Sequence, residues 1–275
     1  MPQRPLADKV AIVTGGGRGL GRAMALGLAA AGAHVVVTAA RHEQEINQVS
    51  EAARRLSDAG TVLPIVADVT REEDCGRAVE AALGSFGALH IVVNNAGRGM
   101  RFVSETFMEA PTRFWEVDGR IWRLIIETNV IGPFLMAKAV VPHFLGQRWG
   151  RIINVSINHE TMRRKGFSPY GPSKAALESE TIIWAQDLAG TGVTVNALLP
   201  GGATQTGMVP ETVGEEVRRR LLDPAIVVPP LLWLASEASD GVTGSRVVAS
   251  AWDPALPPSE AAARARAVAG WAPSG

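Results

Sequence analysis

Tyr170 and Lys174 are the residues whose types and spacing most directly suggest chemistry. Tyr170 is the single tyrosine in 275 residues, and the chain has only four lysines. A separation of four places both side chains on one face of a helix. A phenol beside an ammonium group loses its proton more easily than its ordinary pKa of about 10 implies. The pair is a candidate proton donor with its activating cation, although most such pairs only pack at the start of a helix.

The elements that must position this pair are short apolar strands alternating with helices. Residues 9–14 form a β-branched run that stops at glycines, which is typical of a buried parallel strand. Similar runs predict strands at 34–39, 62–66, 89–93, 151–155, 193–198 and 246–249. Helices are expected at 22–31, 43–56, 72–86, about 122–145, about 170–189, 211–222 and 229–236. The alternation predicts a single α/β domain over residues 1–275, with a doubly wound parallel sheet of the Rossmann type.

The composition points to a globular protein that acts on small molecules. Basic and acidic residues balance at 27 each, so no global field would attract nucleic acid or an anionic membrane. Cys75 is the single cysteine, which excludes a thiolate metal cluster, and we expect no metal site. The longest uncharged run is broken by glycines and prolines, so no membrane helix is expected. Because the first ten residues lack the apolar region of a signal peptide, we expect a cytoplasmic protein.

A glycine-rich turn follows the first strand and opens an alanine-rich helix. Glycines there let the backbone approach a pyrophosphate, whose charge is met by the amides and the positive dipole end of the following helix. The residues of this turn that we assign to a cofactor are Gly15, Arg18, Gly19, Leu20 and Gly21. A tight turn without a ligand is the alternative, but the flanking strand and helix favour a dinucleotide.

The end of the second strand indicates which dinucleotide would bind. A carboxylate there would accept hydrogen bonds from the adenosine ribose and repel a 2′-phosphate. This chain has Ala39 and Ala40 at that place, then Arg41, and Arg18 lies in the glycine-rich turn. Two cations and no acid favour NADP(H), and NAD(H) is the alternative if both arginines are merely solvated.

Six motifs follow one another in a characteristic order. They are Thr14-Gly15-Gly16-Gly17-Arg18-Gly19-Leu20-Gly21, Asp68-Val69-Thr70, Asn94-Asn95-Ala96-Gly97, Asn129, Tyr170-x-x-x-Lys174 and Pro200-Gly201. From about residue 9 to residue 249 the chain therefore resembles the short-chain dehydrogenase/reductase family. The resemblance implies an oxidoreductase that interconverts a ketone or aldehyde and an alcohol by hydride transfer, and a homodimer or homotetramer.

The resemblance also implies cofactor contacts for the matching residues. Asp68 would bond the adenine amino group, and Val69 would pack against the ring. Asn95, Ala96 and Gly97 would hold the end of the fourth strand beside the cofactor ribose. Near the nicotinamide carboxamide the family pattern implies Pro200, Gly201 and a threonine, which falls on Thr206 if one residue is inserted and nearest Gln205 if none is.

For catalysis the resemblance implies three further roles. Tyr170 would be the general acid in reduction, and Lys174 would hold the nicotinamide ribose and lower the pKa of Tyr170. Asn129 would anchor a proton-relay water. Both Tyr170 and Lys174 would thus also touch the cofactor.

The chain departs from the family pattern at the catalytic serine. That serine lies about thirteen residues before the tyrosine, where this sequence has Ile157. Ser156 is one position early, and successive strand residues point to opposite faces. We assign Ser156 as the third catalytic group if a local bulge turns it inward. Asn158 or His159 could supply the hydrogen bond instead, or the third group is absent.

Three segments depart from the alternating pattern. An insertion of about ten residues within 98–122 is rich in aromatic residues, and either lines an apolar substrate pocket or packs against the protein or a subunit. Residues 203–236 are expected to form a mobile lid, and 254–275 either a helix or a loose tail. The substrate would be a carbonyl compound or an alcohol of apolar character. A nucleotide-binding regulatory protein without turnover and an imine reductase are the rival functions.

Overall fold

The computed structural model describes residues 4–270, and its centre is a single eight-stranded sheet. The strands lie in the order β3-β2-β1-β4-β5-β6-β7-β8, and all neighbours are parallel except β7 and β8. Their bounds are β1 Val10–Thr14, β2 His34–Ala39, β3 Val62–Val66, β4 Ile91–Asn94, β5 Gly150–Val155, β6 Val193–Leu199, β7 Ser245–Val248 and β8 Arg266–Val268. The expected doubly wound α/β fold is confirmed.

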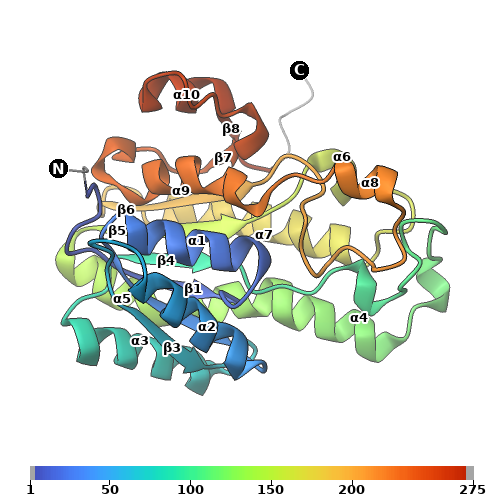
Figure 1. Ribbon diagram of the computed structural model, residues 1–275, viewed down its shortest axis with the longest axis horizontal. Helices are drawn as coiled ribbons and strands as arrows, with labels where there is room; N and C mark the ends of the chain where they lie inside the picture. The colour runs from blue at the N-terminus through green and yellow to red at the C-terminus, as the bar shows by residue number, and fades with distance from the viewer. Residues whose placement is uncertain (1–3, 271–275) are drawn as a thin grey trace.

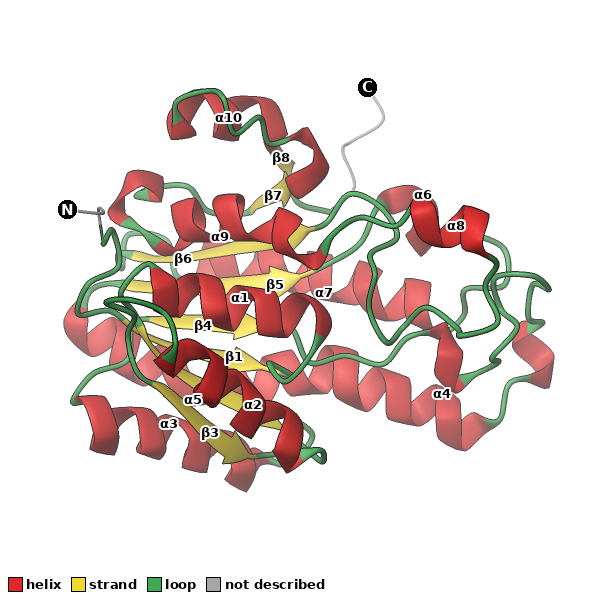
Figure 2. Ribbon diagram, in the orientation of Figure 1, coloured by secondary structure: helices red, strands yellow, loops and turns green. Residues whose placement is uncertain are grey.

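Helices cover both faces of the sheet (Figures 1 and 2). Apolar side chains of α1, α2 and α9 pack on one face, and those of α3, α5 and α7 pack on the other. The helices are α1 Gly19–Ala30, α2 Glu43–Arg54, α3 Glu72–Phe86, α4 Gly119–Ile126, α5 Gly132–Gln147, α6 His159–Met162, α7 Tyr170–Asp187, α8 Glu215–Arg219, α9 Val228–Ala235 and α10 Pro258–Ala265. Both faces are buried, so the strands read as continuous apolar runs.

The order of the strands reverses between β1 and β4, which are neighbours in the sheet. At such a reversal the connecting helices leave toward opposite faces, which opens a crevice at the carboxyl ends of the strands. The side-chain amide of Asn95, just beyond β4, donates to the carbonyl oxygens of Thr14 at 2.8 Å and Gly15 at 2.9 Å. The two strand ends are thereby fastened together at the mouth of the crevice.

One long helical segment connects the insertion to the sheet. Helix α4, a π-helical turn at Glu127–Ile131 and helix α5 follow one another without a break. This segment, Gly119–Gln147, is long and apolar enough to cross a membrane, but half of its most apolar window is buried inside the protein. Leu135, Met136 and Val140 of α5 belong to the core beneath the sheet. Packing on the sheet therefore accounts for part of the apolar character, and Ile131, Phe134 and Leu145 remain exposed.

The expected tail, residues 254–275, contains a helix and a strand in its described part; residues 271–275 lie outside the described residues. Residues 258–265 form α10, and the next three residues form β8, which pairs antiparallel with β7. The strand was not expected from the sequence. The helix expected at 211–222 is confined to α8, and α7 begins at Tyr170 with Pro172 inside its first turn, where proline is tolerated.

Candidate active site

The glycine-rich turn between β1 and α1 is closed against the end of β4. Gly15 has a φ of +62°, and a Cβ atom on it would lie 2.8 Å from the Cα of Ala96. A Cβ on Gly21 would lie 2.2 Å from the carbonyl oxygen of Gly15. Larger residues would push these backbones apart. The turn therefore presents bare backbone at the N-terminus of α1, where an anionic group is favoured.

A cavity of about 350 Å³ opens beside this turn. Most of the residues expected to bind the cofactor line it, namely Gly15, Arg18, Gly19, Leu20, Gly21, Arg41, Asp68, Val69, Asn95, Ala96, Gly97 and Thr206. Its shape and its lining of glycine backbone and arginines suit a dinucleotide with anionic phosphates. Tyr170, Lys174, Asn129, Ser156, Pro200 and Gly201 are not in this lining, so the cavity accounts for the nucleotide end of the site.

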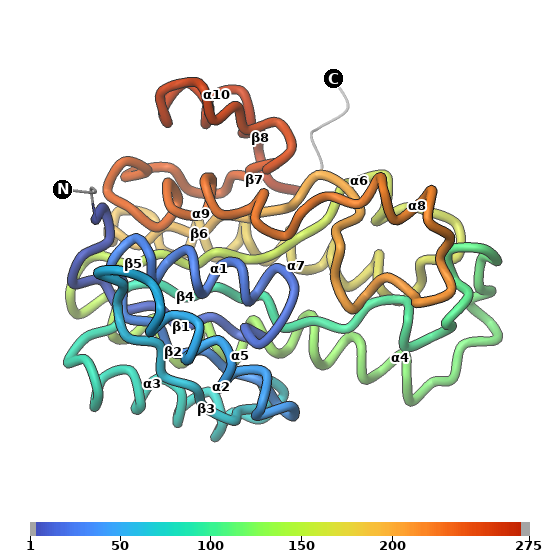
Figure 3. Tube along the Cα trace, viewed as in Figure 1, coloured from blue at the N-terminus to red at the C-terminus, as the bar shows by residue number. Residues whose placement is uncertain are grey.

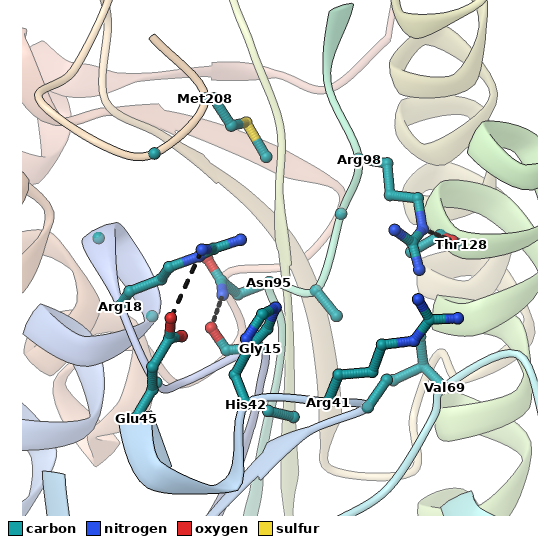
Figure 4. A pocket seen from close by; sticks show the side chains of 18 of the residues that line it. Gly15, Arg18, Arg41, His42, Glu45, Val69, Asn95, Arg98, Thr128 and Met208 are labelled. Atoms are coloured by element: carbon teal, nitrogen blue, oxygen red, sulfur yellow. Dashed lines mark hydrogen bonds and ion pairs between the residues drawn. The ribbon is translucent and has the colours of Figure 1, made fainter. Parts of the chain in front are cut away.

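Four arginines line this cavity, and two of them, Arg98 and Arg101, were not assigned to the cofactor from the sequence; Figure 4 labels Arg18, Arg41 and Arg98. Arg18 is partly paired with Glu45, with Nη1 and Oε1 3.5 Å apart. Arg98 follows directly after Gly97; its Nε donates to the Thr128 hydroxyl at 3.1 Å. Burial lowers the pKa of Arg98, nearby Asp68 opposes this, and nearby Arg41 lowers it further. Among residues 4–270 no carboxylate forms an ion pair with Arg41 or Arg98, which leaves two guanidinium groups facing the cavity.

Asp68 lies at the end of β3, where its carboxylate accepts hydrogen bonds from the backbone and the hydroxyl of Thr70. Its backbone amide donates to Asp74 at 2.9 Å. This bond is the main reason that the pKa of Asp74 is lowered. Val69 packs against the start of α5, because a Cβ on Gly132 would lie 2.7 Å from its Cγ2. The two residues thus form a rigid wall of the cavity.

Asn129 lies within the π-helical turn, a distortion that is frequent at functional sites. Its side chain accepts from the amide of Arg98 at 2.8 Å and donates to the carbonyl of Arg98 at 2.9 Å and to Ser173 at 3.0 Å. A Cβ on Gly97 would lie 3.3 Å from Asn129 Oδ1 and 3.8 Å from Lys174 Nζ. The end of β4, the π-helical turn and helix α7 therefore converge.

Tyr170 and Lys174 occupy the first two turns of α7. Lys174 is buried, and its ammonium donates to the carbonyl of Val155 at the end of β5, at 2.8 Å. Burial lowers the pKa of Lys174 to about 8. Tyr170 retains some contact with solvent, yet the protein around it raises the pKa of its phenol to about 12 by burial. In the protein without cofactor, burial therefore determines the pKa of Tyr170, and the expected lowering of that pKa by Lys174 stays a prediction.

The three candidates for the missing serine have different surroundings. The Ser156 hydroxyl donates to Glu178 at 2.8 Å, and His159 Nδ1 lies 3.0 Å from Arg246 Nη1. The Asn158 side-chain amide donates to the carbonyl of Gly201 at 2.9 Å. In the described part of the chain none of them hydrogen-bonds the Tyr170 hydroxyl. The assignment of Ser156 stays a prediction, and Asn158 is the candidate held against the segment expected near the nicotinamide.

The segment after β6 turns sharply and then covers the glycine-rich turn. Gly201 has a φ of +92°, and a Cβ on it would lie 1.9 Å from the Ser250 hydroxyl. Thr206 lies over the turn, since a Cβ on Gly19 would lie 2.9 Å from its Cγ2. Met208 lines the cavity from the same side. Arg98 and Met208 could both have been identified from the sequence as lining residues, because each lies beside a motif assigned to the cofactor.

The insertion contacts both the segment after β6 and the loop before Tyr170. Figure 3 shows these segments beyond the carboxyl ends of the strands. Arg101 donates to the carbonyl of Gly207 at 3.1 Å, and Phe107 packs edge-on against Phe167 with centroids 5.8 Å apart. Phe114 and Trp115 remain about two-thirds exposed. The insertion thus closes the region around the pair, and its tip stays in solvent.

Comparison with known proteins supports an assignment. The family model for short chain dehydrogenases matches residues 9–216. An uncharacterized oxidoreductase of Mycobacterium tuberculosis is 34% identical over 87% of this chain and 89% of its own length. A 3-oxoacyl-[acyl-carrier-protein] reductase of Synechocystis is 34% identical over 71% of this chain and 74% of its own.

Solved structures agree with this assignment. The 3-ketoacyl-(acyl-carrier-protein) reductase of Brucella melitensis, complexed with NADH, is 30% identical and superposes with a TM-score of 0.75 over 88% of this chain and 96% of its own. A short-chain type dehydrogenase/reductase of Mycobacterium marinum is 28% identical, with a TM-score of 0.76 over 90% and 95% of the two chains. The chain belongs to the short-chain dehydrogenase/reductase family of NAD(P)-dependent oxidoreductases.

Proposed function

We propose that this protein is an NADP(H)-dependent reductase that interconverts a ketone or aldehyde and an alcohol. The observation that carries the proposal is that Lys174 and Asn129 lie beside Gly97, which lines a cavity suited to a dinucleotide, and that Asn129 is hydrogen-bonded to the first turn of α7, which begins at Tyr170. The comparison proteins include two reductases of 3-oxoacyl groups. The aromatic residues of the insertion, of which Phe107 packs on the loop before Tyr170, favour a substrate with apolar character.

The cofactor site fits a phosphorylated dinucleotide. The turn at Gly15–Gly21 would hold the pyrophosphate, and Arg18 and Arg41 would pair with a 2′-phosphate. Arg98 would add a third positive charge at the adenine end. When bound, the nicotinamide supplies or accepts the hydride.

The protein's own groups would handle the proton. Tyr170 would donate its hydroxyl proton to the oxygen of the carbonyl, and Lys174 would hold the cofactor ribose. A phenol with a pKa of about 12 stays protonated at neutral pH, but it is a weaker proton donor than an ordinary tyrosine. Lowering that pKa requires positive charge near the hydroxyl. In this proposal Lys174 would supply that charge if its ammonium turned from the carbonyl of Val155 toward the Tyr170 hydroxyl.

Asn158 is our candidate for the third polar group. Its NH₂ group has two donors, and the bond to Gly201 engages one of them. The second donor is available to polarise a carbonyl oxygen beside Tyr170. The Ser156 hydroxyl, by contrast, has its one proton directed to Glu178.

The substitution Tyr170→Phe removes the proton donor and leaves the ring. We expect kcat for reduction of a panel of ketones and aldehydes to fall at least 100-fold with little change in the Kd of NADPH. Steady-state rates and fluorescence titration measure the two quantities. Full turnover by this variant would sink the mechanism. Binding of NADPH with no turnover by the wild type would favour a regulatory protein, and turnover of cyclic imines alone would favour an imine reductase.

The substitution Arg41→Ala tests the choice of cofactor. We expect KM for NADPH to rise about 10-fold to 100-fold, because a phosphate would lose a charged partner, while KM for NADH changes less than about twofold. Arg77→Ala is the control, since Arg77 is an exposed arginine paired with Asp74 on α3. An equal effect on both cofactors would contradict the preference for NADP(H).

Lys174→Met tests the burial of a positive charge. The pKa of Lys174 is about 8 in the folded protein, against 10.5 for an unperturbed lysine. Between these pH values the folded chain therefore binds fewer protons than the unfolded chain. The free-energy cost of burying the charge is full below pH 8 and disappears as the pH rises through 10.5. At pH 7 we expect the variant without cofactor to be more stable by roughly 1–3 kcal/mol, the gain shrinking toward pH 10.5. Chemical denaturation measures this, with exposed Lys165→Met as control. A gain independent of pH would contradict it.

Asn158→Ala and Ser156→Ala separate the two candidates for the third group. If Asn158 polarises the carbonyl, Asn158→Ala lowers kcat about 10-fold to 100-fold and leaves the Kd of NADPH nearly unchanged. Stopped-flow reduction under single-turnover conditions compares the variants. A larger loss in Ser156→Ala would restore the assignment of Ser156.

A further inference from the structure

Glu178 lies on the same face of α7 as the catalytic pair, one helical turn beyond Lys174. It is 1% exposed, which is rare for a carboxylate unless charged or polar partners surround it. Four such partners come from four separate segments. They are Ser156 after β5, His159 at the start of α6, Arg246 on β7 and Gly270 after β8.

The two carboxylate oxygens of Glu178 face different segments. Oε1 accepts from the Ser156 hydroxyl at 2.8 Å and lies 3.3 Å from Arg246 Nε. Oε2 accepts from the Gly270 amide at 2.9 Å and lies 3.5 Å from His159 Nε2. Each oxygen thus serves one hydrogen-bond donor and one basic side chain. Only a group with two acceptor oxygens satisfies both sides.

Arg246 extends the same network along the loop between β5 and α6. Its Nη1 lies 3.0 Å from His159 Nδ1, and its Nη2 donates to the carbonyl of Ile157 at 3.0 Å. Both ends of the segment 156–159 are therefore attached to Glu178 and Arg246. Asn158 lies between those attachments, and its own amide bond reaches Gly201.

Gly270, whose backbone amide donates to Glu178, is itself tightly packed. Gly270 has a φ of +71°, and a Cβ on it would lie 2.4 Å from Ile182 Cδ1 on α7. The preceding Ala269 amide donates to the carbonyl of Gly244 at 3.0 Å. The C-terminal strand is thereby held against α7 at the level of Glu178.

We propose that Glu178 is a positioning residue, which fixes the loop 156–159 and makes the alignment of Asn158 depend on the C-terminal strand. This inference rests on the proposed reductase function for its kinetic part and on the contacts alone for its structural part. Without the carboxylate, the loop loses the partner of Ser156, and Arg246 loses the negative charge that holds it.

Glu178→Gln tests this role with almost no change in shape. Glutamine has one acceptor oxygen, so its NH₂ group must face either the Gly270 amide or the side of Ser156 and Arg246. Hydrogen exchange is expected to rise about tenfold in peptides covering 156–162 and 266–270, in the protein without cofactor.

Glu180→Gln is the matched control. Glu180 lies on the same helix and is half-buried, which raises its pKa to about 7, yet it makes no hydrogen bond to the loop 156–159. It should leave hydrogen exchange in both peptides unchanged. Equal exchange in both variants and the wild type would overturn the proposal.

Gly270→Ala reaches the same network from the other side. It leaves every charge in place but displaces the amide that Glu178 accepts, so exchange in 156–162 should rise here too. If the Glu178→Gln protein does not fold, hydrogen exchange in Gly270→Ala tests the proposal by itself. Unchanged exchange at 156–162 would then overturn the coupling to the C-terminal strand.

The kinetic arm uses a ketone that the wild type reduces. We expect Glu178→Gln to lower kcat about tenfold, a change of about 1.4 kcal/mol in the barrier, with the Kd of NADPH unchanged. In an Asn158→Ala background the same substitution should lower kcat less than about twofold, because the group that it positions is gone. If the losses of kcat from Glu178→Gln and Asn158→Ala were independent and multiplied, Glu178 would have a merely structural role. Turnover by Tyr170→Phe would instead overturn the reductase function, and hydrogen exchange would still decide this inference.

Discussion

The arrangement of the active site depends on one buried positive charge at the carboxyl edge of the sheet, even though burying that charge costs stability. Lys174 is almost inaccessible to solvent, and the hydrogen bond that replaces water around its ammonium comes from the carbonyl of Val155. A charge is buried at high cost unless such partners are fixed. Helix α7 must therefore lie against the end of β5, and this places Tyr170 where β4 and the π-helical turn also arrive.

The other charged groups around the site follow the same rule in two ways. On the nucleotide side, Arg41 and Arg98 line the cavity and form no ion pair with a carboxylate among the described residues, although Asp68 lies near Arg98; in the proposed function a ligand phosphate would balance them. On the side of α7, Glu178 finds its balance within the protein, in Arg246. The positive charges on the nucleotide side thus have no ion-pair partner among the described residues, whereas the charge of Glu178 on the side of α7 is paired within the protein.

Much of the fold could be predicted because apolar β-branched runs identify buried strands without reference to distant residues. Strands β2 and β3 and helix α3 have the expected bounds. Strand β8 could not be found in this way, since three exposed residues form it only by pairing with β7. The cofactor motifs were informative for a related reason, because backbone geometry demands glycine at their turns.

The side chains of the active site were harder to predict. The direction of Ser156 is set by Glu178, which lies 22 residues away, and the surroundings of His159 are set by Arg246, 87 residues away. The pKa of Tyr170 depends on burial and on the direction of the Lys174 ammonium, and neither follows from a spacing of four. Local sequence patterns identify the candidate residues, and long-range contacts determine the directions of their side chains and their pKa values.

The π-helical turn at Glu127–Ile131 has a consequence for changes in chain length. Its hydrogen bonds join residues five apart, where an α-helix joins residues four apart, so the segment between α4 and α5 accommodates an additional residue. Deleting one residue there would let the helix become regular without any loss of backbone bonding. The deletion would nevertheless rotate Asn129 away from Arg98 and Ser173. The geometry of this part of the site therefore depends on the number of residues in the segment as well as on their identity. An insertion or deletion could move Asn129 at places where a substitution would leave it in position.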